Sequence, residues 1–86
     1  MLTQFMVQSR LKLVIAEYNL RLMRKGDKPV SIRDIADATG LAPSTITGLT
    51  ANRSKGVTFD TVSALCDFFQ VDPGSLFLHT PKSSRE

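Results

Sequence analysis

The sequence predicts an all-α fold, a single compact domain of four or five short helices whose chain ends can add a short pair of strands. With 86 residues, the chain has the length for one hydrophobic core. Its apolar residues recur every three or four positions in separate segments, which is the period of amphipathic helices. Residues that favour helix starts and ends bound each segment. We therefore expect one domain at residues 1–80 and a flexible polar tail at 81–86.

The first helix is predicted by a stripe of apolar side chains in the first third of the chain. The stripe consists of Val7, Leu11, Val14, Ile15, Tyr18 and Leu22. Their spacing places them on one helix face. Cations, Gly26 and Pro29 end the pattern, so we expect a helix at about residues 9–24. Residues 4–8 suit an extension of this helix or a short strand, and both remain open.

Two shorter helices follow, with a glycine between them. Ser31 and Asp34 have the spacing of a capping box, in which side chains satisfy backbone N–H groups at a helix start. Gly40 can end this helix because it adopts the left-handed conformation at little cost. Pro43 suits the first turn of the next helix. The residues of that helix expected in the core are Ile46 and Leu49.

A fourth helix is expected to start after Thr58, which can cap it, and a brief fifth turn to start at Asp72. Residues 76–78 then offer apolar side chains to the core or to a short strand. Cys66 lies among apolar residues, which predicts a buried structural thiol. The apolar face expected for the fourth helix consists of Phe59, Val62, Leu65, Cys66 and Phe69.

The break at Gly40 has a specific architectural meaning. Two short helices joined by a turn of three or four residues that contains glycine form a helix-turn-helix. Ala36, four residues before the glycine, would let the two helices approach closely. The sequence therefore predicts a helix-turn-helix at about residues 31–50.

These residues resemble the XRE, or Cro/CI-type phage-repressor, family of DNA-binding domains. The resemblance runs from about Arg10 to Leu78 and is strongest in SIRDIADATGLAPSTIT, residues 31–47. The segments FDTVSALC and VDPGSL look like the family's later helices. The resemblance implies a lambda-repressor-like domain that binds double-stranded DNA with its third helix in the major groove. It also implies a transcriptional regulator, with repression as the expected outcome.

The third helix supplies the base contacts that the resemblance implies. Its hydroxyls can pair with several base edges, and threonine methyls can contact thymine. Many family members carry Arg or Lys near the position of Gly48, and this chain does not, so we expect moderate sequence discrimination per subunit. The expected base-contacting residues are Ser44, Thr45, Thr47 and Gly48.

A second set of residues is expected to bind the phosphate backbone without choosing a sequence. Many family members have Gln at the position of Ile32, whose side chain cannot bind a phosphate, so the contact would fall to neighbouring groups. The loop 24–30 is basic and either touches the DNA backbone or is a solvated connector. The expected phosphate contacts are Ser31, Arg33, Asn52, Arg53 and Lys55.

Composition narrows the function classes further. Eleven Lys and Arg against eight Asp and Glu give a net charge of +3, which permits a polyanionic partner. One Cys excludes a disulfide within the chain, one Cys and one His cannot supply a four-ligand zinc site, and no catalytic set or cofactor motif is present. We expect no enzyme, cofactor or metal. The absence of a secretory signal pattern and of a long apolar run favours a cytoplasmic protein without a membrane partner.

Two expectations concern protein partners. The alternative function is an antitoxin-like or accessory module that uses the same fold to bind a protein. Its surface would come from Phe68, Phe69, Leu76, Phe77 and Leu78. A homodimer is also expected, because one small domain buries little surface on DNA. Residues 5–8 and 76–79 could pair as strands, within one chain or between two.

Overall fold

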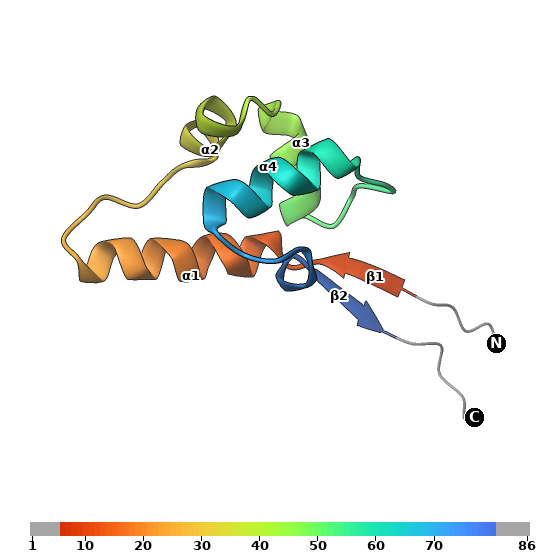
Figure 1. Ribbon diagram of the computed structural model, residues 1–86, viewed down its shortest axis with the longest axis horizontal. Coiled ribbons are helices and arrows are strands. Elements are labelled where there is room, and N and C mark those ends of the chain that lie inside the picture. Colours follow the sequence, from red (N-terminus) through yellow and green to blue (C-terminus); the bar gives the residue numbers. More distant parts are fainter. Residues whose placement is uncertain (1–5, 81–86) are drawn as a thin grey trace.

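The computed structural model describes residues 6–80, so residues 1–5 and the predicted tail at 81–86 lie outside the described part. The predicted helix-turn-helix fold is confirmed, and the brief fifth turn is a 3₁₀ helix, η1 (Figure 1). The elements in chain order are β1 (Met6–Ser9), α1 (Leu11–Arg24), α2 (Ile32–Thr39), α3 (Pro43–Thr50), α4 (Phe59–Phe69), η1 (Pro73–Ser75) and β2 (Phe77–Thr80). None of the helices in this described region is long and apolar enough to span a bilayer.

The two ends of the described chain pair with each other. β1 and β2 are antiparallel, with Val7 opposite His79 and Gln8 opposite Leu78. The predicted strand pair therefore forms within one chain. Of the two alternatives left open for Val7, the strand is the one observed: the residue lies in β1 and is 66% exposed, so it is not part of the apolar stripe of the first helix. Pairing with a distant strand decides that this segment is extended. The Arg10 amide N–H donates a hydrogen bond to the Leu76 carbonyl at 2.7 Å, which fixes the junction between β1 and α1.

The predicted helix boundaries around α2 and α4 are confirmed by their caps. Ser31 Oγ accepts from the Asp34 amide at 3.1 Å, and the Asp34 carboxylate accepts from the Ser31 amide at 2.9 Å. Gly40 follows α2 with φ of 77°, the left-handed conformation expected there. Thr58 Oγ1 caps α4 by accepting from the Thr61 amide at 3.2 Å. Local sequence signals thus set these ends.

The core lies where the four helices meet. Its buried side chains come from every helix and from the residue before β2: Leu11, Val14, Ile35, Ala36, Ile46, Leu49, Leu65, Phe69 and Leu76. Tyr18 on α1 closes one side by packing edge-on against Phe69, with ring centroids 5.1 Å apart. Phe69 and Leu76 are each 2% exposed, so their proposed place on a partner-binding surface is wrong.

The prediction for α4 needs one further correction. Phe59 was expected on the apolar face, but it is 93% exposed. The buried face runs instead through Thr61, Leu65 and Phe69, spaced four residues apart. Thr61 can occupy this face because its hydroxyl oxygen accepts a hydrogen bond from Thr58 Oγ1 at 3.1 Å. Phe59 precedes the buried Thr61 by two positions, which is about 200° of helix rotation. Phe59 therefore points away from the core.

Candidate nucleic-acid interface

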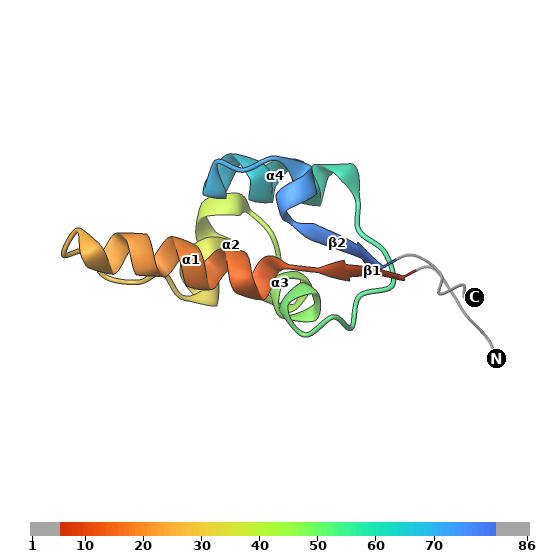
Figure 2. The same ribbon diagram turned by 90° about the horizontal axis from the view of Figure 1, so that it is seen from below.

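Helix α3 is held with one face inward and the other in solvent. Ile46 is fully buried and Leu49 is 6% exposed, as predicted, and α3 packs against α1 and α2 through them. Ala36 on α2 is buried in the same core cluster, and α2 contacts α3. Figure 2 shows α3 along one side of the molecule and α4 along the opposite side. The outward face of α3 is therefore uncovered by the described chain.

The outward face carries hydroxyl groups. Ser44 and Thr47 are exposed and lie three residues apart, and exposed Ala51 continues the same stripe at the end of the helix. Thr47 Oγ1 donates its hydrogen to the Pro43 carbonyl at 2.7 Å. The Thr47 oxygen thus remains available as an acceptor, while its methyl group remains apolar. An acceptor of this kind suits the amino groups of adenine or cytosine in the major groove.

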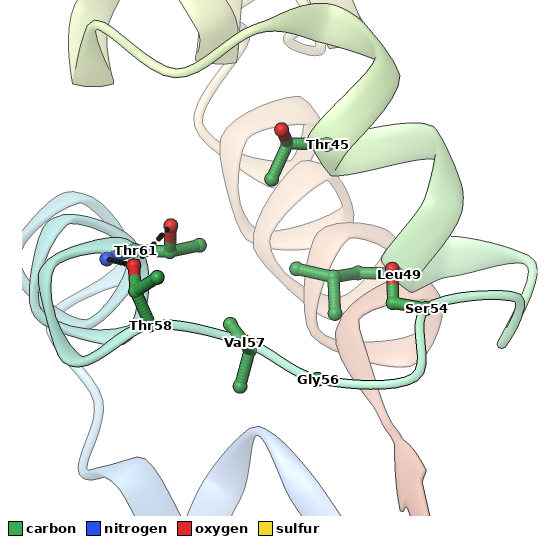
Figure 3. A pocket seen from close by; sticks show the side chains of 7 residues that line it. All are labelled: Thr45, Leu49, Ser54, Gly56, Val57, Thr58 and Thr61. Atoms are coloured by element: carbon green, nitrogen blue, oxygen red, sulfur yellow. Dashed lines mark hydrogen bonds between the residues drawn. The ribbon is translucent and has the colours of Figure 1, made fainter.

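Two of the four expected base-contacting residues are turned partly toward the protein. Thr45 is half-buried and lines a pocket of about 350 Å³ between α3, the loop 51–58 and α4 (Figure 3). Gly48 is also half-buried, and a Cβ there would come within 2.9 Å of Ser54 Oγ. The close approach of this loop, rather than of DNA alone, is a reason for glycine at this position.

The start of α2 presents backbone and side-chain donors. Ser31 and Arg33 are both exposed. Within the described residues, the amides of Ile32 and Arg33 form no hydrogen bond, as is usual in the first turn of a helix. Free amides and the positive end of the helix dipole favour a phosphate oxygen. The Asp34 carboxylate offsets part of this attraction, since Ser31 lowers the pKa of this carboxyl and keeps it ionised.

The residues after α3 differ in what their side chains can do. Arg53 and Lys55 are exposed on the loop, in agreement with a role at the phosphate backbone. Asn52 has φ of 58° and its side chain holds β1: Asn52 Oδ1 accepts from the Ser9 amide at 2.6 Å, and Nδ2 donates to the Ser9 carbonyl at 3.4 Å. Asn52 therefore connects the end of α3 to β1, a contact between residues too distant in sequence to predict.

Lys12 joins this region although no motif singled it out. It is exposed, and it lines a hollow together with Ile32 at the start of α2 and Thr50 and Ala51 at the end of α3. A cation here lies beside both segments of the helix-turn-helix. The sequence showed Lys12 only as one of several cations in the first third of the chain, because its position depends on how α1 packs.

The basic connector between α1 and α2 lies elsewhere. Asn19 holds it in place: its side chain accepts from the Val30 amide at 2.7 Å and donates to the Val30 carbonyl at 3.1 Å. Figure 1 shows the connector at the end of α1 that is far from the strands, next to α2. This position agrees better with a solvated connector than with a contact close to α3.

The titratable side chains of the described part of the chain do not gather into a metal site. Among residues 6–80, no group of three or more His, Cys, Asp or Glu side chains could hold a metal ion. Cys66 is half-buried on α4. Burial raises the pKa of the Cys66 thiol, and the nearby charges of Asp67 and Asp72 raise it further. The thiol is therefore mostly protonated at neutral pH and a poor nucleophile.

Comparisons with known proteins agree with this geometry. A family model for the Cro/C1-type HTH DNA-binding domain matches residues 15–82. The structure is similar to a crystal structure of a candidate DNA-binding protein from Bacteroides fragilis, with a TM-score of 0.64 and 25% sequence identity. That alignment covers 85% of this chain and 100% of the other. Among curated proteins, none matches the sequence.

Proposed function

The chain belongs to the Cro/C1-type helix-turn-helix DNA-binding family, and from this premise we propose that it is a sequence-specific regulator of transcription. In the proposed complex, α3 enters the major groove of double-stranded DNA. One observation carries the proposal: burial of Ile46 and Leu49 turns the hydroxyl face of α3 into solvent. A short helix with an uncovered polar face is suited to reading base edges.

We divide the contacts by their chemistry. Ser44 and Thr47 lie at the centre of the proposed base-reading surface, with Thr45 and Gly48 at its border. The phosphate backbone would be bound by exposed groups around that surface, which fix the orientation of α3. Asn52 contributes by holding α3 against β1. The proposed phosphate-binding groups are Lys12, Ser31, Arg33, Arg53 and Lys55.

The regulatory role rests on size as well as on chemistry. A single small domain buries only about 600–1,000 Å² of its surface on DNA, which limits affinity. Two copies on neighbouring half-sites would double the contact and restrict the spacing of the operator. We therefore propose a homodimer. We further propose that this dimer acts in the cytoplasm and represses transcription by occupying its operator.

The decisive experiment separates base reading from phosphate binding. Bound sites are first selected from a random oligonucleotide pool, and affinities are then measured for the selected duplex and a scrambled duplex at two salt concentrations. Replacing Ser44 and Thr47 with Ala should reduce the ratio of the two affinities by roughly tenfold, with little change for the scrambled duplex. Thr47→Val is the matched variant that keeps the methyl group and removes the acceptor.

Arg33→Ala serves as the opposite control. It should weaken binding to both duplexes alike and lower the slope of log affinity against log salt by about 1. If the Ser44 and Thr47 replacements leave the affinity ratio unchanged, α3 does not read the bases through this face.

The alternative function remains a module that binds a protein, as an antitoxin or accessory factor does. Phe77 is half-buried and Leu78 is 48% exposed, so part of the apolar surface that this function needs is accessible. The same assay discriminates the two functions. No binding to any duplex at low salt would favour the protein partner, because the electrostatic contribution to DNA binding is largest there.

A further inference from the structure

An exposed aromatic side chain stands beside an apolar groove on one face of the protein. Phe59 is the first residue of α4 and has the largest exposed fraction, 93%, among the exposed large apolar residues of the described chain. A groove of about 500 Å³ begins at this side chain. Its other walls come from the loop before α4, from α4, from η1 and from β2: Val57, Val62, Ser63, Cys66, Pro73 and Phe77.

The combination is not explained by the fold of a single chain. The first position of a helix gives no preference to phenylalanine, and Thr58 already caps α4 through its hydroxyl. An exposed phenyl ring lacks the burial that normally stabilises this side chain. Exposed apolar patches of this kind mark interaction sites. The groove beside it bears no charged side chain, so its occupant must also be apolar.

We propose that a second copy of this chain covers this face, with Phe59 of each copy seated in the groove of the other. This inference rests on the proposed function in one respect, since it names the surface by which two copies act together on DNA. The Phe59 side chain, which we call the knob, and the groove belong to the same face of the same chain. A two-fold axis therefore brings both pairs into contact at once, as a self-complementary interface requires.

Charge and area agree with a second copy as a weakly bound occupant. The exposed charges nearest to Phe59 and Val57 in the sequence are Asp60 and Lys55, which have opposite signs and offset each other between copies, whereas Asp67 and Asp72 add negative charge near the groove residue Cys66. Each phenyl ring contributes about 150–250 Å² of buried surface. Two rings and the groove walls that cover them reach roughly 600–1,000 Å², below the about 1,200 Å² at which stable specific interfaces begin, which predicts a weak and reversible dimer.

The position of the groove leaves the proposed DNA-binding face free. Its walls belong to α4, η1, β2 and the loop before α4, and none belongs to α3. Figure 2 shows α4 and α3 on opposite sides of the described chain, with the loop 51–58 joining them at the end where the strands lie. A copy seated in the groove therefore does not cover Ser44 or Thr47.

Sedimentation equilibrium of the whole chain tests the interface with two variants. Phe59→Ser removes the knob, and Ser63→Lys places a charge in the groove at an exposed helix position. Each should weaken the dimer at least about tenfold, as expected for an aromatic anchor that is lost twice in a two-fold interface. Leu20→Ser is the matched control, because Leu20 is 45% exposed on α1 and does not line the groove. Circular dichroism checks that all three variants stay folded.

Mixing the two variants gives the sharpest result. The Phe59→Ser homodimer has no knob, and the Ser63→Lys homodimer has a charge in both grooves. The mixed dimer pairs Phe59 of the Ser63→Lys chain with the uncharged groove of the Phe59→Ser chain, which lacks only its own Phe59 wall. Association should therefore reappear on mixing, at an affinity between those of the single variants and the wild type. A contact made elsewhere on the surface would show no such rescue.

Three results would overturn the inference: a monomeric wild type at tens of micromolar, a dimer unaffected by Phe59→Ser and Ser63→Lys, or no association on mixing. A dimer unaffected by either variant would direct attention to the open edges of the β1–β2 sheet. Failure of this interface is distinguishable from failure of the proposed function. Binding of the scrambled duplex at low salt does not depend on Phe59, so its loss in the wild type would count against DNA binding alone.

Discussion

Helices α2 and α3 have the same length, eight residues each, but they are specified in opposite ways. α2 has a complete capping box at its start and Gly40 in the left-handed conformation at its end. α3 starts after Ala42, which makes no side-chain cap, and it is rich in threonine and contains Gly48. Thr and Gly both have low helix propensity. Only Pro43, at the first turn, favours the start of α3 locally.

The difference shows what holds each helix in place. A helix of eight residues is too short to be stable by itself, so both need tertiary packing. α2 adds local signals to that packing, whereas α3 depends on Ile46 and Leu49 for its position. Because the remaining residues of α3 are not needed to make it helical, its outward positions are free to be chosen for a partner. The predictions below test this contrast.

The largest effect is expected at the tertiary anchor of α3. Ile46→Ala should lower the free energy of unfolding by about 2–5 kcal/mol, because it removes a fully buried side chain and leaves a cavity. Chemical denaturation followed by circular dichroism measures this loss. Thr47→Ala, one position further and exposed, should change stability by less than about 0.5 kcal/mol. Equal effects of the two substitutions would show that α3 is not anchored through Ile46.

A smaller effect is expected where α2 ends. Gly40→Val should cost about 1–3 kcal/mol, since a β-branched residue resists the left-handed conformation. No atom lies within 4 Å of a Cβ built at this position, so the loss reports backbone strain alone. Gly40→Asn is the control, because asparagine tolerates positive φ better. Thermal denaturation should rank glycine, asparagine and valine in descending stability, and any other order would contradict the local origin of this helix end.

The smallest effect is expected at the capping box, and it depends on pH. Hydrogen bonds from Ser31 lower the pKa of Asp34 below its ordinary value of 3.8. The ionised carboxylate therefore stabilises the fold above that pH, and the stabilisation is lost as the pH falls through the lowered pKa. Asp34→Asn should be less stable than the wild type at neutral pH, and the two should converge in acid. Asp37→Asn is the control variant, because it removes the same charge from an exposed position on α2 that has no role in the cap.

Local chemistry explains why so much of the helix-turn-helix was predictable. Ser31, Gly40, Pro43 and Thr58 act on backbone groups within four residues, so their roles can be inferred from spacing. The inward direction of Ile46 and Leu49 follows from helical periodicity in the same way. Periodicity failed at Phe59, because a polar residue, Thr61, takes the buried face when its hydroxyl is hydrogen-bonded.

The candidate site was predictable only in part. The exposure of Ser44, Thr47, Arg33, Arg53 and Lys55 agrees with the roles expected of them. The side chain of Asn52 binds β1 instead, and Gly48 accommodates Ser54. Lys12 reaches the region through the packing of α1. Each of these outcomes depends on contacts between elements, and spacing along the chain carries no information about them.

The sequence by itself determined the helix-turn-helix, its caps and the side of α3 that faces the core, because these depend on short-range hydrogen bonds and on helical period. The tertiary structure decided the pairing of β1 with β2, the clamp between Asn52 and Ser9, and the exposure of Phe59 beside its groove. Contacts between distant segments depend on which surfaces remain unpaired after the helices have packed. That outcome is set by the whole fold and by no single segment.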